Sequence, residues 1–243
     1  MHKNILAAAL LAVPLCAGAA DLTVSAAASL SNAFKELAQA FEAANPGDKV
    51  LLNFAASDPL VQQIAKGAPV DVLAAADQDA MDKAERAKLL AAGTRRDFVS
   101  NTVVLVVPGG SRIATLADLN GAARLTTGNP ASVPIGRYTR EALEQAGLWQ
   151  ALAPRFVFGA SVRQSLDYVA RGEADAGFVY ATDVMAQKDK VRAVLTLPTV
   201  TPVRYPIAVT ANAAQPRLAL RFIDFAAVGP GQAILLRHGF GKP

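Results

Sequence analysis

The sequence predicts an α/β protein built from two lobes, and two features of the chain carry this prediction. Short β-type segments alternate with amphipathic segments along most of the 243 residues, an order typical of sheets flanked by helices. Two long apolar stretches, around 100–107 and 203–209, lie where the chain can pass from one half to the other and return. Such a chain builds one lobe from both ends and the other from its middle. A single open sheet fits the periodicity almost as well.

The first half shows a strand-helix-strand-helix-strand order, which predicts a parallel sheet. Its elements are a strand at 22–26, a helix over 30–41, a strand at 49–54, a helix from about 60 that ends at Gly67, and a strand at 71–76. Apolar residues recur at 4-3-4 spacing from Leu30 to Phe41, so this helix has one apolar face.

The second half repeats the pattern. Its predicted elements are a strand segment at 98–108, a strand at 124–127, a helix at 137–146, a strand at 155–158, a helix from 162 to 169, strands at 175–180, 191–197 and 203–210, and two C-terminal helices. We find neither an internal repeat nor a long linker. The expected sheets are therefore mostly parallel and flanked by helices.

Residues 1–20 have the layout of a secretory signal peptide, with Lys3 before an apolar run and small residues at the end. We expect cleavage near Ala20 and a periplasmic location. The only cysteine, Cys16, lies in this segment. A lipid anchor on Cys16 would need a small residue before it, and Leu15 is not small.

The composition argues against several classes of function. Without Lys3 the chain has 23 basic and 20 acidic residues, a formal charge of +3, and no basic cluster, so we expect no nucleic-acid partner. With no cysteine and one histidine after the leader, a zinc site is not expected. A serine nucleophile would need a base, and His238 is the sole candidate. The sequence contains no GxSxG, P-loop, GxGxxG or HExxH motif.

Four strand-to-helix junctions share small or hydroxyl residues where a helix should begin. They are Ala27-Ala28-Ser29-Leu30, Ala55-Ala56-Ser57-Asp58-Pro59, Val133-Pro134-Ile135-Gly136 and Gly159-Ala160-Ser161-Val162. In an open α/β sheet, such junctions lie at the carboxyl ends of the strands, where ligands bind. Helix N-termini carry unpaired N–H groups and partial positive charge. Several of them aimed at one point would hold an anion without any cation.

Each of these features also has a purely structural interpretation. Ser29 and Ser57 can be helix caps, and Ser161 with Gln164 forms a capping-box pattern. Tyr180, just past an apolar strand, can point into a cleft or be a buried tyrosine with a satisfied hydroxyl. On amphipathic helices, arginines are expected to be solvated; this applies to Arg137, Arg140 and Arg163. Asp77 and Asp79 are expected to favour a helix start.

The chain resembles the periplasmic molybdate-binding proteins of ABC importers over about residues 22–240. The resemblance rests on AAASL (26–30), QQIAKGAPVDVLAAADQDAMD (62–82), GNPASVPIGRYTREAL (128–143) and GFVYATD (177–183). It implies a two-lobed type II periplasmic binding protein with a ligand cleft between the lobes. Lobe 1 would comprise 21–101 and 204–243, and lobe 2 would comprise 102–203.

In the family, uncharged donors hold the oxyanion. Carried over by motif, the ligand-binding residues are Ser29, Ser57, Ile135, Val162 and Tyr180, with the amides of Ile135 and Val162 as donors. Two positions depart from the family pattern. Asp58-Pro59 follows the second serine; Pro59 suits the first helical position, which would make Asp58 the cap. A smaller alanine is common where Ile135 stands.

The resemblance implies high-affinity capture of molybdate, and also of tungstate, and its delivery to a permease at the membrane. We expect a monomer with no enzymatic activity, no cofactor and no metal-cation ligands. Three alternatives stay open: a receptor for another anion such as sulfate or a small organic acid, an exported serine hydrolase using Ser29 or Ser57, and the effector-sensing part of a regulator. The last would need a helix-turn-helix, for which the sequence has no room before residue 22.

Overall fold

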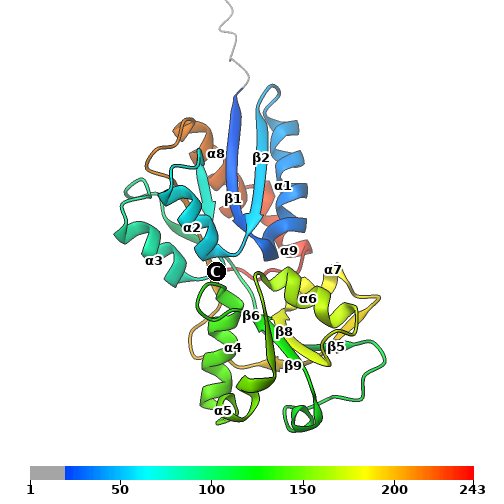
Figure 1. The fold of residues 1–243 in the computed structure, drawn as a ribbon. Coiled ribbons are helices and arrows are strands. Elements are labelled where there is room, and N and C mark those ends of the chain that lie inside the picture. The colour runs from blue at the N-terminus through cyan, green and yellow to red at the C-terminus, as the bar shows by residue number, and fades with distance from the viewer. Residues whose placement is uncertain (1–19) are drawn as a thin grey trace, which may run out of the picture.

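The computed structural model describes residues 20–243 and contains two five-stranded sheets, one in each of two lobes (Figure 1). The predicted signal peptide, including Cys16, lies outside the described residues apart from Ala20. The two-lobed α/β fold is confirmed.

Lobe 1 contains the sheet with strand order β2-β1-β3-β10-β4. Its strands are β1 (Asp21–Ala27), β2 (Lys49–Ala55), β3 (Val72–Ala74), β4 (Arg96–Ser100) and β10 (Arg204–Val209). Its helices are the 3-10 turn η1 (Ala28–Leu30), α1 (Ser31–Ala44), α2 (Ser57–Ala65), α3 (Gln78–Arg86), α8 (Pro216–Ala227) and α9 (Pro230–Arg237).

Lobe 2 contains the sheet with strand order β7-β6-β8-β5-β9. Its strands are β5 (Val103–Pro108), β6 (Leu125–Gly128), β7 (Phe156–Gly159), β8 (Ala176–Tyr180) and β9 (Val191–Leu197). Its helices are α4 (Pro134–Gln145), α5 (Trp149–Leu152), α6 (Val162–Ala170) and α7 (Ala181–Ala186), with the 3-10 turns η2 (Ala117–Gly121) and η3 (Ala153–Arg155).

The two sheets have the same topology, and in each of them four strands run in one direction and one runs against them, so the sheets are mostly parallel, as predicted, with one antiparallel strand. β1 pairs in parallel with β2 and β3, and β6 pairs in parallel with β7 and β8. The fourth strand of each sheet, β10 or β5, is antiparallel to both of its neighbours. The reason is topological, because each of these strands enters from the other lobe and so runs against the strands of the lobe that it joins.

The apolar segment 98–108 is not one strand, as its pattern suggested. It divides into β4 and β5, which belong to different sheets, and Asn101 and Thr102 lie between them. Both halves of the segment are buried, so its hydrophobicity does not reveal the break. The chain crosses back between β9 and β10, and this confirms the predicted double crossing.

Local signals place several helix ends as the sequence predicts. Asp77 caps α3 by accepting the Ala80 N–H at 3.1 Å, and Ser161 caps α6 by accepting the Gln164 N–H at 3.3 Å. Helix α2 ends at Ala65, and Gly67 follows with φ of +89°, a left-handed conformation that favours glycine.

The core of lobe 1 is centred on aromatic rings from helices α1 and α8. The Phe222 ring packs edge-on against Phe34 and Phe41, with centroids 6.0 and 5.3 Å apart. In the part of the chain that the structure describes, no single helix is long and apolar enough to cross a bilayer; α8 and α9 pass that test only as a pair bent by 54°. Leu218, Ile223 and Leu235 from these two helices are buried in the lobe.

Replacing Phe222 by alanine should lower stability strongly. The fully buried ring would leave a cavity beside two other rings, at a cost of about 3–5 kcal/mol. We expect a fall in the urea midpoint of lobe 1 unfolding. Val228→Ala, at a site that is 78 % exposed, is the control and should shift the midpoint little. Equal shifts for the two variants would contradict this account of the core.

Candidate ligand-binding site

The structure brings all five predicted ligand residues to one small cavity between the lobes. The cavity has a volume of about 10 Å³. Its lining consists of Ala27, Ala28, Ser29, Ala56, Ser57, Ala76, Val133, Pro134, Ile135, Val162 and Tyr180. No charged side chain belongs to this lining among the described residues.

Both lobes contribute to the cavity through the carboxyl ends of their strands. Ser29 and Ser57 follow β1 and β2 of lobe 1, while Ile135, Val162 and Tyr180 follow or end β6, β7 and β8 of lobe 2. The parallel pairing of these strands within each lobe brings their ends to one edge of each sheet. The two edges face each other across the cavity, as expected for a ligand site in open α/β sheets.

Neither lobe 1 serine caps a helix through its side chain, so the capping interpretation is wrong for Ser29 and Ser57. The Ser57 Oγ accepts the backbone N–H of Ala76 at 3.0 Å. Because that N–H can only donate, the Ser57 hydroxyl retains its own hydrogen for another acceptor. The Ser29 Oγ lies 2.9 Å from the Tyr205 hydroxyl.

Tyr180 supplies the third hydroxyl of the cavity. Its side chain is buried, and its hydroxyl oxygen has no hydrogen-bond partner among the described residues. The ring packs edge-on against Tyr205, with centroids 5.7 Å apart. Burial raises the pKa of Tyr180 well above its usual value, so the hydroxyl keeps its hydrogen. A buried donor left without an acceptor is costly, so the Tyr180 hydroxyl is a candidate donor to a ligand.

The N-termini of three α-helices add backbone donors. Ser57 and Val162 are the first residues of α2 and α6, and Ile135 is the second residue of α4, after Pro134. N–H groups in the first turn of a helix have no acceptor within it. Gly136 holds α4 close to the end of β6, since a Cβ there would lie 2.0 Å from the Gly128 carbonyl oxygen.

Asp58 is not the cap of α2, contrary to the sequence interpretation. The helix begins at Ser57 with Ala56 as its N-cap residue, so Pro59 is its third residue. The Asp58 carboxylate instead pairs with Lys83 Nζ at 2.8 Å and with Arg137 Nη1 at 2.6 Å. Its charge is therefore compensated and turned away from the cavity lining.

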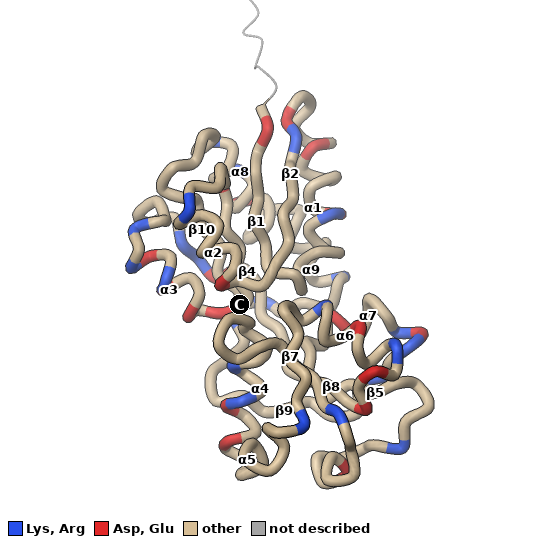
Figure 2. Tube along the Cα trace, in the orientation of Figure 1, with Lys and Arg blue, Asp and Glu red and all other residues tan. Residues whose placement is uncertain are grey.

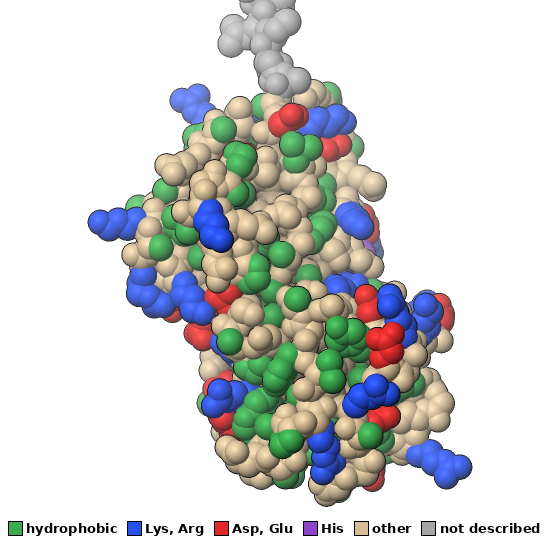
Figure 3. Space-filling model, viewed as in Figure 1, with side chains coloured by type: hydrophobic (Ala, Val, Ile, Leu, Met, Phe, Trp, Pro, Cys, Tyr) green, Lys and Arg blue, Asp and Glu red, His purple; other side chains and the backbone are tan. Residues whose placement is uncertain are grey.

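Arg137 links the two lobes. The expectation that its side chain is solvated is wrong. From α4 of lobe 2 it donates to Asp58 and, through Nε and Nη2, to Asp77 at 2.8 and 2.6 Å. Burial raises the pKa of Asp77, an effect that Arg137 opposes. Acidic residues lie where α2 and α3 approach α4 (Figure 2), and charged side chains flank the narrow waist of the molecule (Figure 3).

Arg163 is likewise paired. Arg140 is exposed as predicted; it pairs with Glu144 on its own helix and lies over the Trp149 ring. The Arg163 Nε lies 2.8 Å from the buried Asp183 carboxylate, and its Nη2 donates to the Ser29 carbonyl oxygen at 3.4 Å. Burial raises the pKa of Asp183 to about 6, and the charge of Arg163 limits the rise.

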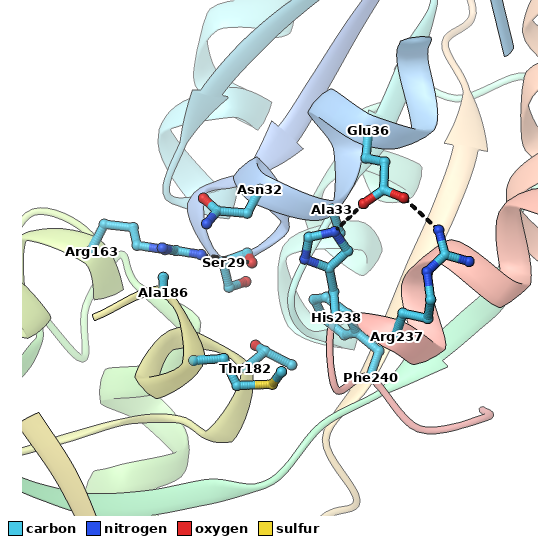
Figure 4. A pocket seen from close by; sticks show the side chains of 11 residues that line it. Ser29, Asn32, Ala33, Glu36, Arg163, Thr182, Ala186, Arg237, His238 and Phe240 are labelled. Atoms are coloured by element: carbon cyan, nitrogen blue, oxygen red, sulfur yellow. Dashed lines mark hydrogen bonds and ion pairs between the residues drawn. The ribbon is translucent and has the colours of Figure 1, made fainter. Parts of the chain in front are cut away.

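A second groove also has Ser29 in its lining (Figure 4). There Glu36 accepts hydrogen bonds from Arg237 and pairs with His238 Nε2, the latter at 2.8 Å. The imidazole thus engages a carboxylate, and the Ser29 hydroxyl engages Tyr205. The Ser-His contact that a hydrolase would use is not among the hydrogen bonds of the described residues.

Two residues with roles at the site were missed by the sequence interpretation. Tyr205 lies in β10 and Asn101 lies between β4 and β5; both contact the Ser29 region through side-chain hydrogen bonds. In the sequence, Tyr205 reads as one more residue of an apolar strand. Only the pairing of strands distant in sequence brings it beside Ser29.

Two lobes of equal topology, joined by two crossings and with strand ends of both at one cavity, define the class of two-lobed periplasmic binding proteins. Residues 22–241 match the family model described as bacterial extracellular solute-binding protein. The chain belongs to this family.

Curated relatives and solved structures agree with the assignment. The chain is 36% identical to the molybdate-binding protein ModA of Escherichia coli (strain K12), with 90% of this chain and 88% of that protein covered. It is 32% identical to the protein of the same name from Haemophilus influenzae, with 92% and 91% covered. The periplasmic molybdate-binding protein of Azotobacter vinelandii superposes with a TM-score of 0.80 at 25% identity, covering 91% of this chain and 99% of that one.

Removing Arg137 should destabilise the contact between the lobes. Arg137→Ala leaves Asp58 and Asp77, both buried, without their guanidinium, and breaking a buried pair costs about 3–5 kcal/mol. We expect a lower melting temperature and a larger radius of gyration by small-angle X-ray scattering. Arg140→Ala is the matched control: it removes an exposed pair with Glu144 and a cation–π contact with Trp149, 5.9 Å from the ring centroid, both within lobe 2. It should lower the melting temperature much less and leave the radius of gyration unchanged. Indistinguishable variants would refute the role of Arg137 between the lobes.

Proposed function

We propose that this protein captures molybdate, and also tungstate, in the periplasm and delivers the oxyanion to the permease of an ABC importer. The observation that carries the proposal is the buried, unpartnered Tyr180 hydroxyl at a cavity shared with two serines and three helix N-termini. The molybdate-binding relatives support the choice of ligand. In this proposal the protein acts as a monomer, without cofactor or catalysis, after cleavage near Ala20.

The ligand-binding residues in this proposal are Ser29, Ser57, Ile135, Val162 and Tyr180. Three hydroxyls and the backbone N–H groups of the first four of these residues give seven donors for four oxygens. At about 2 kcal/mol for each hydrogen bond to a charged acceptor, they supply about 14 kcal/mol before the cost of association. That sum is enough for submicromolar binding.

Such a site selects its guest by protonation and by size. A fully deprotonated dianion accepts from every donor, whereas hydrogen phosphate would turn its own hydrogen against one of them and lose a hydrogen bond. Sulfate has no hydrogen to reject, so its shorter bonds to oxygen must exclude it. The tight lining, with its several alanines, leaves little freedom to adjust to a smaller anion.

Capture involves rotation of the lobes, which we assign to 21–101 with 204–243 and to 102–203. The two crossings, next to β4–β5 and β9–β10, are the only covalent links between the lobes in the described chain. Closure brings the donors of lobe 2 onto an anion held by lobe 1 and excludes water, which strengthens each hydrogen bond.

The geometry favours an inorganic oxyanion over an organic acid. Recognition of a carboxylate commonly uses an arginine, but Arg137 and Arg163 are engaged by Asp58, Asp77 and Asp183 and do not line the cavity. A sulfate-binding protein from Mycobacterium tuberculosis shares the fold at 21% identity, a likeness that concerns the fold alone. The hydrolase alternative finds no support in the hydrogen bonds of Ser29.

A panel of oxyanions tests the proposal. Molybdate and tungstate should each raise the melting temperature of the protein lacking residues 1–20, since a ligand of the native state stabilises it, and sulfate and phosphate should raise it far less. Equal stabilisation by sulfate, or none by molybdate, would overturn the choice of ligand.

Tyr180→Phe tests the residue that carries the argument. Loss of one hydrogen bond to a charged acceptor should weaken molybdate binding by about 10- to 100-fold in isothermal titration calorimetry. Tyr168→Phe changes a tyrosine outside the cavity and should bind like the native protein. If Tyr180→Phe also retains full affinity, its hydroxyl does not contact the ligand.

A further inference from the structure

Asn101 and Tyr205 form a short hydrogen-bond relay that ends at Ser29. The Asn101 Nδ2 donates to the Tyr205 hydroxyl at 3.3 Å, and the Tyr205 hydroxyl lies 2.9 Å from the Ser29 Oγ. Tyr205 is fully buried, and Asn101 and Ser29 are nearly so. Neither Asn101 nor Tyr205 belongs to the cavity lining, so both act through Ser29.

The direction of the relay is fixed at its Asn101 end. The Asn101 Oδ1 accepts the backbone N–H of Thr102 at 2.9 Å, which sets the orientation of the amide. The two hydrogens of its Nδ2 are then directed to Tyr205 and to the Thr182 Oγ1, the latter at 2.9 Å. An amide nitrogen cannot accept a hydrogen bond, so the Tyr205 oxygen is the acceptor in its contact with Asn101.

The hydrogen bond between Tyr205 and Ser29 also has one favoured direction. The Tyr205 hydroxyl has one hydrogen, and the Ser29 Oγ is its remaining partner among the hydrogen bonds of the described residues. If Ser29 donated to Tyr205 instead, the Tyr205 hydrogen would be buried without an acceptor, which is unfavourable. Tyr205 therefore donates to Ser29, and the Ser29 hydrogen is free to point elsewhere. The cavity is the open direction, because Ser29 lines it.

We propose that Asn101 and Tyr205 are positioning residues that hold the Ser29 hydroxyl as a donor toward the bound oxyanion, and so contribute to selection of the deprotonated form. This inference rests on the proposed function. The Ser57 hydroxyl is oriented as a donor in the same way, but by a backbone group, the Ala76 N–H. Of these two serines, Ser29 is the one whose hydroxyl is oriented by side chains, so mutation can test its orientation.

A double-mutant cycle separates this role from simple packing. Molybdate affinity is measured by calorimetry for the native protein, Tyr205→Phe, Ser29→Ala and the double variant, each checked for folding by circular dichroism. Tyr205→Phe should weaken binding by about tenfold in the native background. In the Ser29→Ala background it should weaken binding by no more than about twofold, because the hydroxyl that it orients is gone. Tyr168→Phe is the control in both backgrounds.

Additive losses in the cycle would overturn the relay, as they would mean that Tyr205 acts independently of Ser29. An unchanged affinity of Tyr205→Phe would do the same. If Tyr205→Phe does not fold, Asn101→Ala gives the same cycle, because it removes the donor that sets the direction. Absence of molybdate binding by the native protein would instead refute the proposed function itself, and the two failures are therefore distinguishable.

Discussion

A buried doubly charged anion can be held without a cation only if every polar group that faces it presents a hydrogen. This requirement explains the composition of the cavity lining, which combines hydroxyl groups and helix N-termini, all hydrogen-bond donors, with alanines that have no polar side chain. It also explains the fold around it. Parallel strands that end at one edge, each followed by a helix, aim several helix N-termini at one point, and two such lobes do so from both sides.

The charged residues near the cavity are arranged so that none of them faces the anion. Arg137 and Arg163 reach from lobe 2 toward lobe 1, but Asp58, Asp77 and Asp183 neutralise them at 2.6 to 2.8 Å. In the same pairs, the arginines offset the negative charge of the carboxylates, which would otherwise repel an anion. The Arg137 pairs thus join lobe 2 to lobe 1, the Arg163–Asp183 pair lies within lobe 2, and the cavity lining carries no charged side chain among the described residues.

The alternation of strands and helices, the double crossing and the convergence of Ser29, Ser57, Ile135, Val162 and Tyr180 could be predicted, because strand ends and helix starts are local signals. Contact of these residues with a ligand stays a prediction. The break at Asn101, the one antiparallel strand in each sheet and the pairing of Arg137 could not be predicted. Each depends on which strands or helices meet across long sequence distances, and hydrophobic periodicity does not record that.

The origin of each donor suggests an order of events in capture. Ser29 and Ser57 accept hydrogen bonds from Tyr205 and Ala76, and all four residues belong to lobe 1, so these contacts do not require the lobes to be closed. Ile135, Val162 and Tyr180 come from lobe 2, and in the proposed mechanism they meet the anion on closure. In the proposed mechanism, the hydroxyls of lobe 1 are already oriented as donors and so favour a deprotonated anion. Closure of the lobes then adds affinity. Asn101 lies in one crossing between the lobes, and Tyr205 is the second residue of the strand that follows the other crossing, so the residues that orient Ser29 lie next to the two covalent links between the lobes.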